Sequence, residues 1–217
     1  MSTTTEIAPP APRTSRRRLI LGAVALAALA GIALDTHVVR IGSEQDLAVA
    51  GFSPEKFGAE KFPAVRESIV SRAVDAATLS QAVAADKAAA AKQYGVAAGV
   101  GSVIPVKFTG VVGEGKSGIY YVDVPGMPAD VKVRVQTGPA INGTDLRDAT
   151  GEIAFGHFKN QIEYQNAGAA INNTMKKEVL AGLDNSALTG KTISVTGAFT
   201  LVNPKNWLVT PVEISVQ

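Results

Sequence analysis

The chain has 217 residues, of which 46% are hydrophobic, enough to bury a core, and this argues against an intrinsically disordered protein. Its formal net charge is +2, but four arginines before residue 19 supply that excess. The charge is therefore no argument for nucleic-acid binding. Cysteine is absent, which excludes disulfides, thiol nucleophiles, cysteine metal sites and a lipidated N-terminal cysteine.

The N-terminal region has the layout of an export signal. Residues 1–18 form a polar leader that ends in three consecutive arginines, and residues 19–34 form an uncharged apolar run of sixteen residues. We expect the leader to stay in the cytoplasm and the C-terminal domain to lie in the periplasm, because positively charged flanks are retained on the cytoplasmic side. Residues 35–53 then form a tether.

The apolar run has two interpretations. Sixteen residues are few for a membrane span, which needs about 20, and suit the core of a signal peptide cleaved before Gly31, with release into the periplasm. An uncleaved signal anchor in the inner membrane is favoured, because the run continues past that site to Leu34. Residues 15–20 also resemble a twin-arginine signal, so the export route stays open between that pathway and Sec.

Residues 54–95 carry a helical pattern, which we interpret as a helical extension between the tether and the following domain. Pro63 can occupy the first turn of one helix, since proline is tolerated there. Thr78 starts a capping box for a second, alanine-rich helix, and Gly95 follows its end.

From residue 96 to the end, alternating apolar residues predict short strands and one helix. In chain order, the three strands, the helix and the last two strands are expected at residues 104–112, 120–124, 131–135, 158–180, 193–199 and 212–216. This is the element order of an OB-fold, and Gly110 and Gly197 lie mid-strand, where small barrels bend sharply. The predicted fold class is therefore α+β, mainly β: an OB-fold-like five-stranded barrel over residues 96–217, with a helix between strands three and four.

Two stretches are distinctive: GPAINGTDLRDA at residues 138–149 and FKNQIEYQ at residues 158–165. With them, the sequence from about residue 35 to the end resembles a family of predicted periplasmic lipoproteins of unknown function (domain-of-unknown-function family 2291). The resemblance implies a barrel related to the OB-fold. Many members are encoded beside ribose-type sugar ABC transporters, which implies an accessory role in sugar uptake. Many are also attached through a lipid-bearing cysteine, and its absence here favours the uncleaved anchor.

The long connection before the helix, and the helix itself, hold the main candidate residues. Arg147 and Asp148 offer a guanidinium fork and a carboxylate for sugar hydroxyls or a partner's charges, although a structural ion pair that fixes the loop is favoured. Asn160, Gln161 and Tyr164 combine planar amides with an aromatic ring, as sugar sites do. The alternative is that they tie the helix to nearby backbone.

Trp207 is predicted in the loop between the last two strands, where OB-folds often bind ligands, and a core position is the favoured alternative. No metal or cofactor is expected. The two histidines, His37 and His157, are 120 residues apart, and no dinucleotide or phosphate-loop motif is present.

We therefore expect a non-catalytic, membrane-anchored periplasmic accessory protein of a ribose-type sugar ABC transport system. Its expected partners are the inner membrane, through residues 19–34, and a sugar, a solute-binding protein or the permease, but no nucleic acid. One alternative is a purely structural envelope subunit. The other is an envelope enzyme acting on glycans, for which Asp145 with Asp148, or Glu152 with Asp148, supplies the paired carboxylates.

Overall fold

The structure is a computed structural model that describes residues 20, 22–28, 31 and 51–217. Residues 20, 22–28 and 31 are helical and exposed, and residues 51–217 belong to a separate compact unit. No helix among these described residues is long and apolar enough to cross a membrane. The predictions for residues 1–18 and 35–50, and for the rest of the apolar run, lie outside the described residues.

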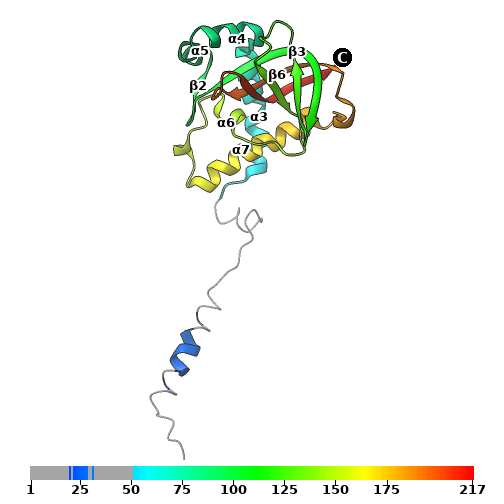
Figure 1. Cartoon of the computed structure of the whole chain (residues 1–217). Coiled ribbons are helices and arrows are strands. Elements are labelled where there is room, and N and C mark those ends of the chain that lie inside the picture. The colour runs from blue at the N-terminus through cyan, green and yellow to red at the C-terminus, as the bar shows by residue number, and fades with distance from the viewer. Residues whose placement is uncertain (1–19, 21, 29–30, 32–50) are drawn as a thin grey trace, which may run out of the picture. The chain divides into compact units, whose positions relative to one another are not determined.

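Five strands of the compact unit pair into a closed ring (Figure 1). The strands are β3 (Ser102–Lys116), β4 (Ile119–Asp123), β5 (Lys132–Gln136), β6 (Thr192–Thr200) and β7 (Asn206–Val216). Their pairing order is β3–β4–β5–β7–β6 and back to β3, and only β5–β7 is parallel. Two short strands, β1 (Val74–Asp75) and β2 (Val96–Ala97), pair with the outer edge of β3.

Two glycines let the ring curve as tightly as it does, as the sequence predicted. A Cβ on Gly110 would collide with the carbonyl oxygen of Asp123 on β4, and a Cβ on Gly197 would collide with that of Thr210 on β7. The β6–β7 register also shifts between Thr196 and Gly197. A bulge of this kind bends its strand and increases the local twist, so both glycines are required by the close approach of neighbouring backbone.

The last strand begins earlier than predicted, and this corrects the position of Trp207. Proline cannot donate to a strand ladder, so Pro211 made the sequence look like a strand starting only at residue 212. In the structure Pro211 pairs with Gly197 at the bulge, and β7 already starts at Asn206. Trp207 is therefore a fully buried strand residue, stacked on Phe199 with ring centroids 4.7 Å apart.

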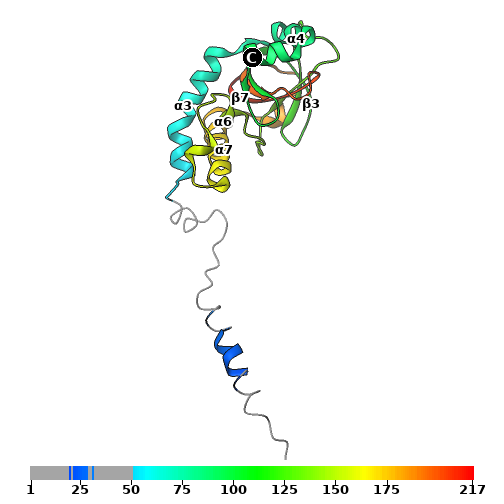
Figure 2. The ribbon, with the colours of Figure 1, turned by 90° about the vertical axis from the view of Figure 1, so that its left-hand side faces the viewer.

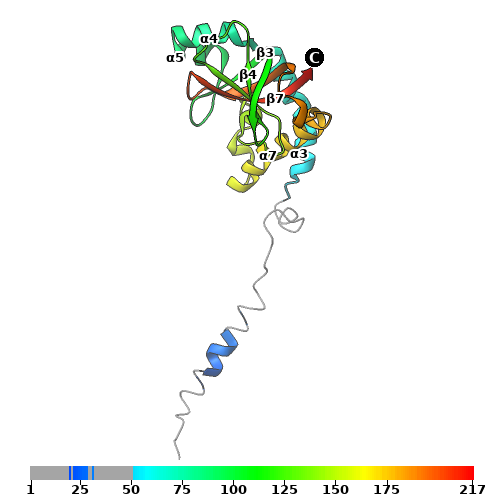
Figure 3. The same ribbon diagram turned by 45° about the vertical axis from the view of Figure 1, so that its right-hand side comes forward.

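Helices cover both ends of the ring. The helices are α3 (Pro54–Arg72), α4 (Ala76–Ala85), α5 (Lys87–Tyr94), α6 (Asp145–Asp148) and α7 (Gln161–Met175), which continues into a π-helical turn, Lys176–Leu180. Figures 1 and 3 show α4 and α5 at one end and α7 at the other. Two 3-10 turns, Phe155–His157 and Asn185–Ala187, flank α7.

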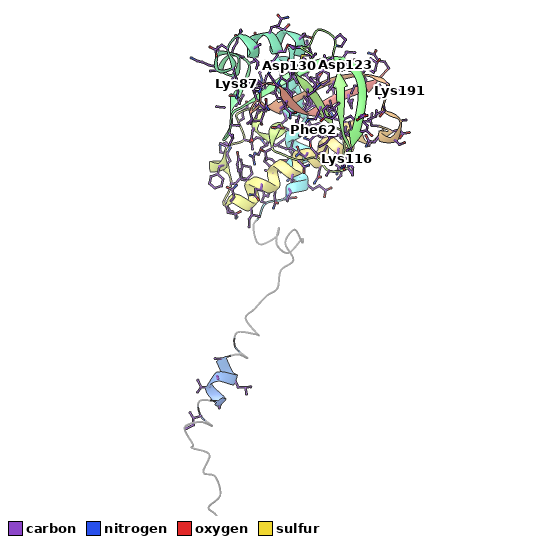
Figure 4. The ribbon with its side chains drawn as sticks, viewed as in Figure 1. Phe62, Lys87, Lys116, Asp123, Asp130 and Lys191 are labelled. Atoms are coloured by element: carbon purple, nitrogen blue, oxygen red, sulfur yellow. The ribbon has the colours of Figure 1, made fainter. Side chains whose placement is uncertain are left out.

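The helix α3 starts nine residues before the predicted position, because Pro54 rather than Pro63 occupies its first turn. It packs against α7, as Figure 2 shows from the side. Gly58 makes this contact close, since a Cβ there would collide with the carbonyl oxygen of Ala170. Farther along α3, Phe62, labelled in Figure 4, is fully buried.

The second predicted helix is two helices, α4 and α5. Asp86 has extended backbone between them, and its carboxylate accepts hydrogen bonds from the N–H groups of Ala88 and Ala89. The predicted cap at Thr78 is wrong, since Asp75 is the N-cap of α4 and accepts the Thr78 N–H at 3.1 Å. Gly95 does follow the end of α5, as predicted.

Replacing Gly110 with alanine tests the close approach of β3 and β4. We expect Gly110→Ala to lower the free energy of unfolding by about 3 kcal/mol, at the upper end of overpacking costs, because the obstacle is backbone rather than a mobile side chain. Gly113→Ala in the same strand is the matched control, since its Cβ would lie 3.7 Å from the Tyr121 carbonyl oxygen, an ordinary contact. Urea denaturation measures both, and equal effects would contradict this account.

Candidate functional site

A surface cavity of about 720 Å³ lies where α6, the start of α7 and the end of β6 meet. Its volume falls in the range of small-molecule sites. Its polar and charged lining comes from three separate parts of the chain: Thr144, Asp145, Arg147, Asp148, Tyr164 and Thr200. Sequence analysis named four of these residues, Asp145, Arg147, Asp148 and Tyr164, and the fold brings all six to one place.

A hollow of similar volume, also about 720 Å³, lies over the outer side of β3, β6 and β7. Several of its residues are outward-facing strand residues that pair with one another, such as Thr109 and Ser194, whose hydroxyls are 2.8 Å apart. The α6–α7 cavity instead gathers a buried guanidinium and a carboxyl group with a shifted pKa. Because such groups concentrate at functional sites, we take the α6–α7 cavity as the candidate site.

Arg147 is the structural centre of the site. Its Nε donates to Asp148 at 2.7 Å, one terminal nitrogen donates to the other Asp148 oxygen at 3.1 Å, and the second donates to the Tyr164 carbonyl oxygen at 3.0 Å. The whole residue is only 6% exposed. A bidentate pair of this kind fixes both side chains, and the hydrogen bond to the Tyr164 carbonyl joins α6 to α7.

The aromatic ring of Tyr164 completes the environment of Arg147. The guanidinium carbon lies 3.6 Å from the ring centroid, a cation–π contact. Burial, and then the negative charge of Asp148, raise the pKa of Tyr164, so its hydroxyl stays protonated at neutral pH. Gly168 on α7 leaves the space for this stack, since a Cβ there would contact both Thr144 and Arg147.

Asp145 is the carboxylate with hydrogen-bonding capacity left for a ligand. It accepts hydrogen bonds from the hydroxyls of Thr200 and Thr210, whereas a carboxylate can accept about four. Burial raises its pKa above the ordinary value, and the charge of Asp148 adds to this, while the Thr200 hydrogen bond opposes it. The fold therefore keeps a carboxyl group on the cavity wall where ionisation is unfavourable.

Asp148 is committed to structure. One of its oxygens accepts from Arg147 and faces the Tyr164 hydroxyl at 3.5 Å, and the other accepts from Arg147 and, at 2.7 Å, from Thr144. Its acceptor sites are therefore occupied, and the favoured sequence interpretation of Arg147 and Asp148 as a pair that fixes the loop agrees with this geometry.

A buried glutamine supports the cavity from behind. Gln136, which is fully buried at the end of β5, exchanges two hydrogen bonds of 3.0 Å with the backbone of Asn142. Its amide also donates to the Thr210 hydroxyl at 2.8 Å, and that hydroxyl donates to Asp145. The network holds the loop after β5 and positions the Asp145 carboxyl group from the ring side.

The other sequence candidates lie elsewhere. Asn160 is the N-cap of α7 and accepts the Glu163 N–H at 2.9 Å, so it ties the helix to its own backbone. Gln161 is exposed in the first turn and does not line the cavity. Trp207 is buried in the ring, and Glu152 is exposed and does not line the cavity either.

Sequence analysis missed Thr144, Thr200 and Phe155 as cavity residues. Thr144 lies within the distinctive stretch at residues 138–149, and that was the available signal. Thr200 is 55 positions from its partner Asp145, and nothing in the sequence joins them. Within the part of the chain that the structure describes, no group of three or more His, Asp or Glu residues is placed to hold a metal ion.

The closed ring with α7 between its third and fourth strands defines an OB-fold protein. A crystal structure of an OB-fold protein from Thermotoga maritima is similar, with a TM-score of 0.61 and 19% identity, covering 76% of this chain and 99% of that one. Identity this low shows the fold alone. A comparison with curated proteins finds no match. The chain belongs to DUF2291, the predicted periplasmic lipoprotein family, which matches residues 22–215.

Membership confirms the family resemblance seen in the two distinctive stretches. The family is one of unknown function, and its members are predicted to be periplasmic and attached to a membrane by lipid. This chain departs from that description in one chemical respect, because it has no cysteine to carry the lipid.

Removing the Arg147 charge should be strongly destabilising. Arg147→Met leaves the Asp148 carboxylate without its partner, which costs about 3 kcal/mol for a buried pair. Lys177→Met is the control: its ion pair with Glu55 has similar length, 3.0 Å, but both side chains are well exposed, so we expect less than about 1 kcal/mol. Chemical denaturation measures both. The double variant Arg147→Met with Asp148→Asn should recover part of the loss, and no recovery would argue against an uncompensated charge.

The raised pKa of Asp145 gives a pH-dependent stability. The folded chain holds this proton more tightly than the unfolded chain, so stability from this group rises as the pH falls from the raised pKa towards 3.8, the ordinary value. Asp145→Asn cannot ionise, and we expect it to be more stable than the natural protein at neutral pH. Urea denaturation across pH should show this difference shrinking as the pH falls. A difference that grows on acidification would refute the assignment.

Proposed function

We propose that this protein is a non-catalytic, membrane-anchored accessory protein of a ribose-type sugar ABC transport system, and that it binds a sugar in the α6–α7 cavity. Its family of predicted periplasmic lipoproteins supports a position at the membrane in the periplasm. Without a cysteine for lipid attachment, the apolar run at residues 19–34 is the segment of the chain suited to the anchoring role.

One observation carries the binding proposal: the lining of one cavity includes the Asp145 carboxyl group, with free acceptor capacity, and the aromatic ring of Phe155. Phe155 is 50% exposed and packs edge-on against Tyr164. Carboxylates accept hydrogen bonds from sugar hydroxyls, and aromatic faces cover the apolar C–H faces of sugars. A volume of about 720 Å³ admits a monosaccharide.

The non-catalytic part of the proposal is supported by the carboxylate positions. Glycoside hydrolysis needs two carboxyl groups that flank the scissile bond. Asp145 and Asp148 lie on the four-residue helix α6, three positions apart, and the acceptor sites of Asp148 are taken by Arg147 and Thr144. Together they supply one available carboxyl group from one side.

Calorimetric titration of the full chain in detergent with ribose and related pentoses and hexoses tests the binding. We expect Asp145→Asn to weaken the affinity about tenfold or more, because a hydrogen bond to a charged group contributes about 1.5–3 kcal/mol. This variant is expected to be folded and more stable, so lost binding would not reflect unfolding. Asp123→Asn is the control: Asp123 is an exposed acid at the end of β4, outside this cavity (Figure 4).

The outcomes separate the proposal from its rivals. Saturable binding that Asp145→Asn weakens and Asp123→Asn leaves unchanged supports a sugar-binding accessory protein. Absence of heat with every sugar, together with no permease or solute-binding protein copurifying from membranes, would overturn it in favour of a structural subunit. Turnover of a glycan that Asp145→Asn abolishes would instead establish an envelope enzyme.

A further inference from the structure

An aromatic cluster lies where the chain enters the compact unit. Phe52, Phe57 and Phe158 contact one another, with ring centroids 5.4 to 5.7 Å apart. Phe158 also contacts Tyr164, at 5.4 Å. The cluster joins the first described residues of the unit to the start of α7 and to the cavity wall. Figures 1 and 2 show the start of α3 beside the start of α7.

Large apolar side chains are exposed to solvent around the cavity and in the first turn of α7. We call them the apolar end surface: Val100, Phe155, Ile162 and Val202, with exposed fractions of 75%, 50%, 59% and 53%. Val100, Phe155 and Val202 line the mouth of the same cavity, and Ile162 is in the first turn of α7. Of the eight large hydrophobic residues exposed within residues 51–217, these are half. Apolar residues gathered in this way mark an interaction surface, whereas scattered ones do not.

The composition of the surface fits the interface of a lipid bilayer. Between Glu152 and Glu163 the sequence IAFGHFKNQI has one charged residue, a lysine, and no acidic residue. Phenylalanine and isoleucine with polar, uncharged or basic neighbours are the side chains that enter the headgroup boundary of a membrane. A surface that binds an acidic or a highly charged partner would need a different set of side chains, with more charged groups.

The length of the connection to the apolar run limits how far this surface can lie from a membrane that holds that run. Residues 35–50, sixteen residues, separate the apolar run from Gly51, and a chain of that length reaches no more than about 60 Å when fully extended. Gly51 also lies near Lys159, which stands between Phe155 and Ile162 in the sequence, since a Cβ on Gly51 would be 3.6 Å from the Lys159 ammonium group. An anchored chain therefore holds this surface at a high effective concentration near the bilayer, where even weak contacts are populated.

We propose that the apolar end surface docks on the periplasmic face of the membrane in which residues 19–34 are anchored, so that the cavity mouth opens at the membrane surface. The proposal rests on the anchor in the proposed function, but not on sugar binding. Docking orients the domain, and a ligand would then enter or leave the cavity beside membrane-embedded partners.

The absence of cysteine makes a direct test simple. Single variants Phe155→Cys and Ile162→Cys of the full chain carry a nitroxide label, and the chain is reconstituted in vesicles of phosphatidylethanolamine and phosphatidylglycerol. Val216→Cys is the matched control, since Val216 is 44% exposed and β7 ends at the opposite end of the unit from the start of α7 (Figures 1 and 3). All labelled sites are half-exposed, so folding is retained, and circular dichroism verifies this.

The measurements are vesicle flotation and nitroxide accessibility to oxygen against a water-soluble nickel complex. Docking predicts flotation and an oxygen-to-nickel accessibility ratio severalfold higher at positions 155 and 162 than at 216. Flotation with all three labels equally accessible to nickel overturns docking and leaves the anchor intact. A chain that does not float overturns the anchor, and docking with it. Equal protection of the label from nickel at position 216 would show nonspecific adsorption of the domain to the vesicles. Protection that depends on protein concentration without lipid would show that a second copy of the chain covers the surface. Either result overturns the proposal.

Discussion

The buried guanidinium of Arg147 has partners on α6 and on α7, and the connection between the third and fourth ring strands depends on it. This connection is long, since it runs from residue 137 to residue 191. Arg147 fixes Asp148 on its own short helix, the backbone of Tyr164 on the next helix, and the Tyr164 ring above it. Gly168 leaves room for the stack. The cavity therefore depends on a charged side chain that is buried with a hydrogen bond from each of its three guanidinium nitrogens, because burial of a charge is tolerated when it is paired and hydrogen-bonded.

The same geometry separates the roles of two neighbouring acids. Asp148 gives its acceptor sites to Arg147 and Thr144, so it stabilises the wall of the cavity. Asp145 faces the two threonine hydroxyls of the ring, keeps free acceptor capacity and has a raised pKa because of its burial. A carboxyl group kept where its ionisation is unfavourable opposes stability, and such groups cluster at binding and catalytic sites. This contrast directs the sugar-binding proposal to Asp145, although the sequence pointed first to Asp148.

The cavity and the apolar end surface adjoin each other, since Val100, Phe155 and Val202 line the cavity. Phe155 belongs to both, because it lines the cavity mouth and is half-exposed. The chain enters the unit through Phe52, which contacts Phe158. With the proposed anchoring and docking, the cavity opens at the membrane surface, which suits the proposed role beside a transporter.

The sequence by itself determined the strand and helix order, because period-two and helical patterns are local properties of the chain. It also determined the two mid-strand glycines, the family, and the absence of a cysteine for lipid attachment. Its loop position for Trp207 was wrong, because Pro211 at a bulge hides the start of β7, whereas the favoured core position was right. It was also wrong about the start of the first helix, because two prolines could each start it. Only the tertiary structure decided the site. Asp145 and Thr200 are 55 residues apart, and they meet because the ring closes on itself, which depends on contacts between strands rather than on the residues next to each of them.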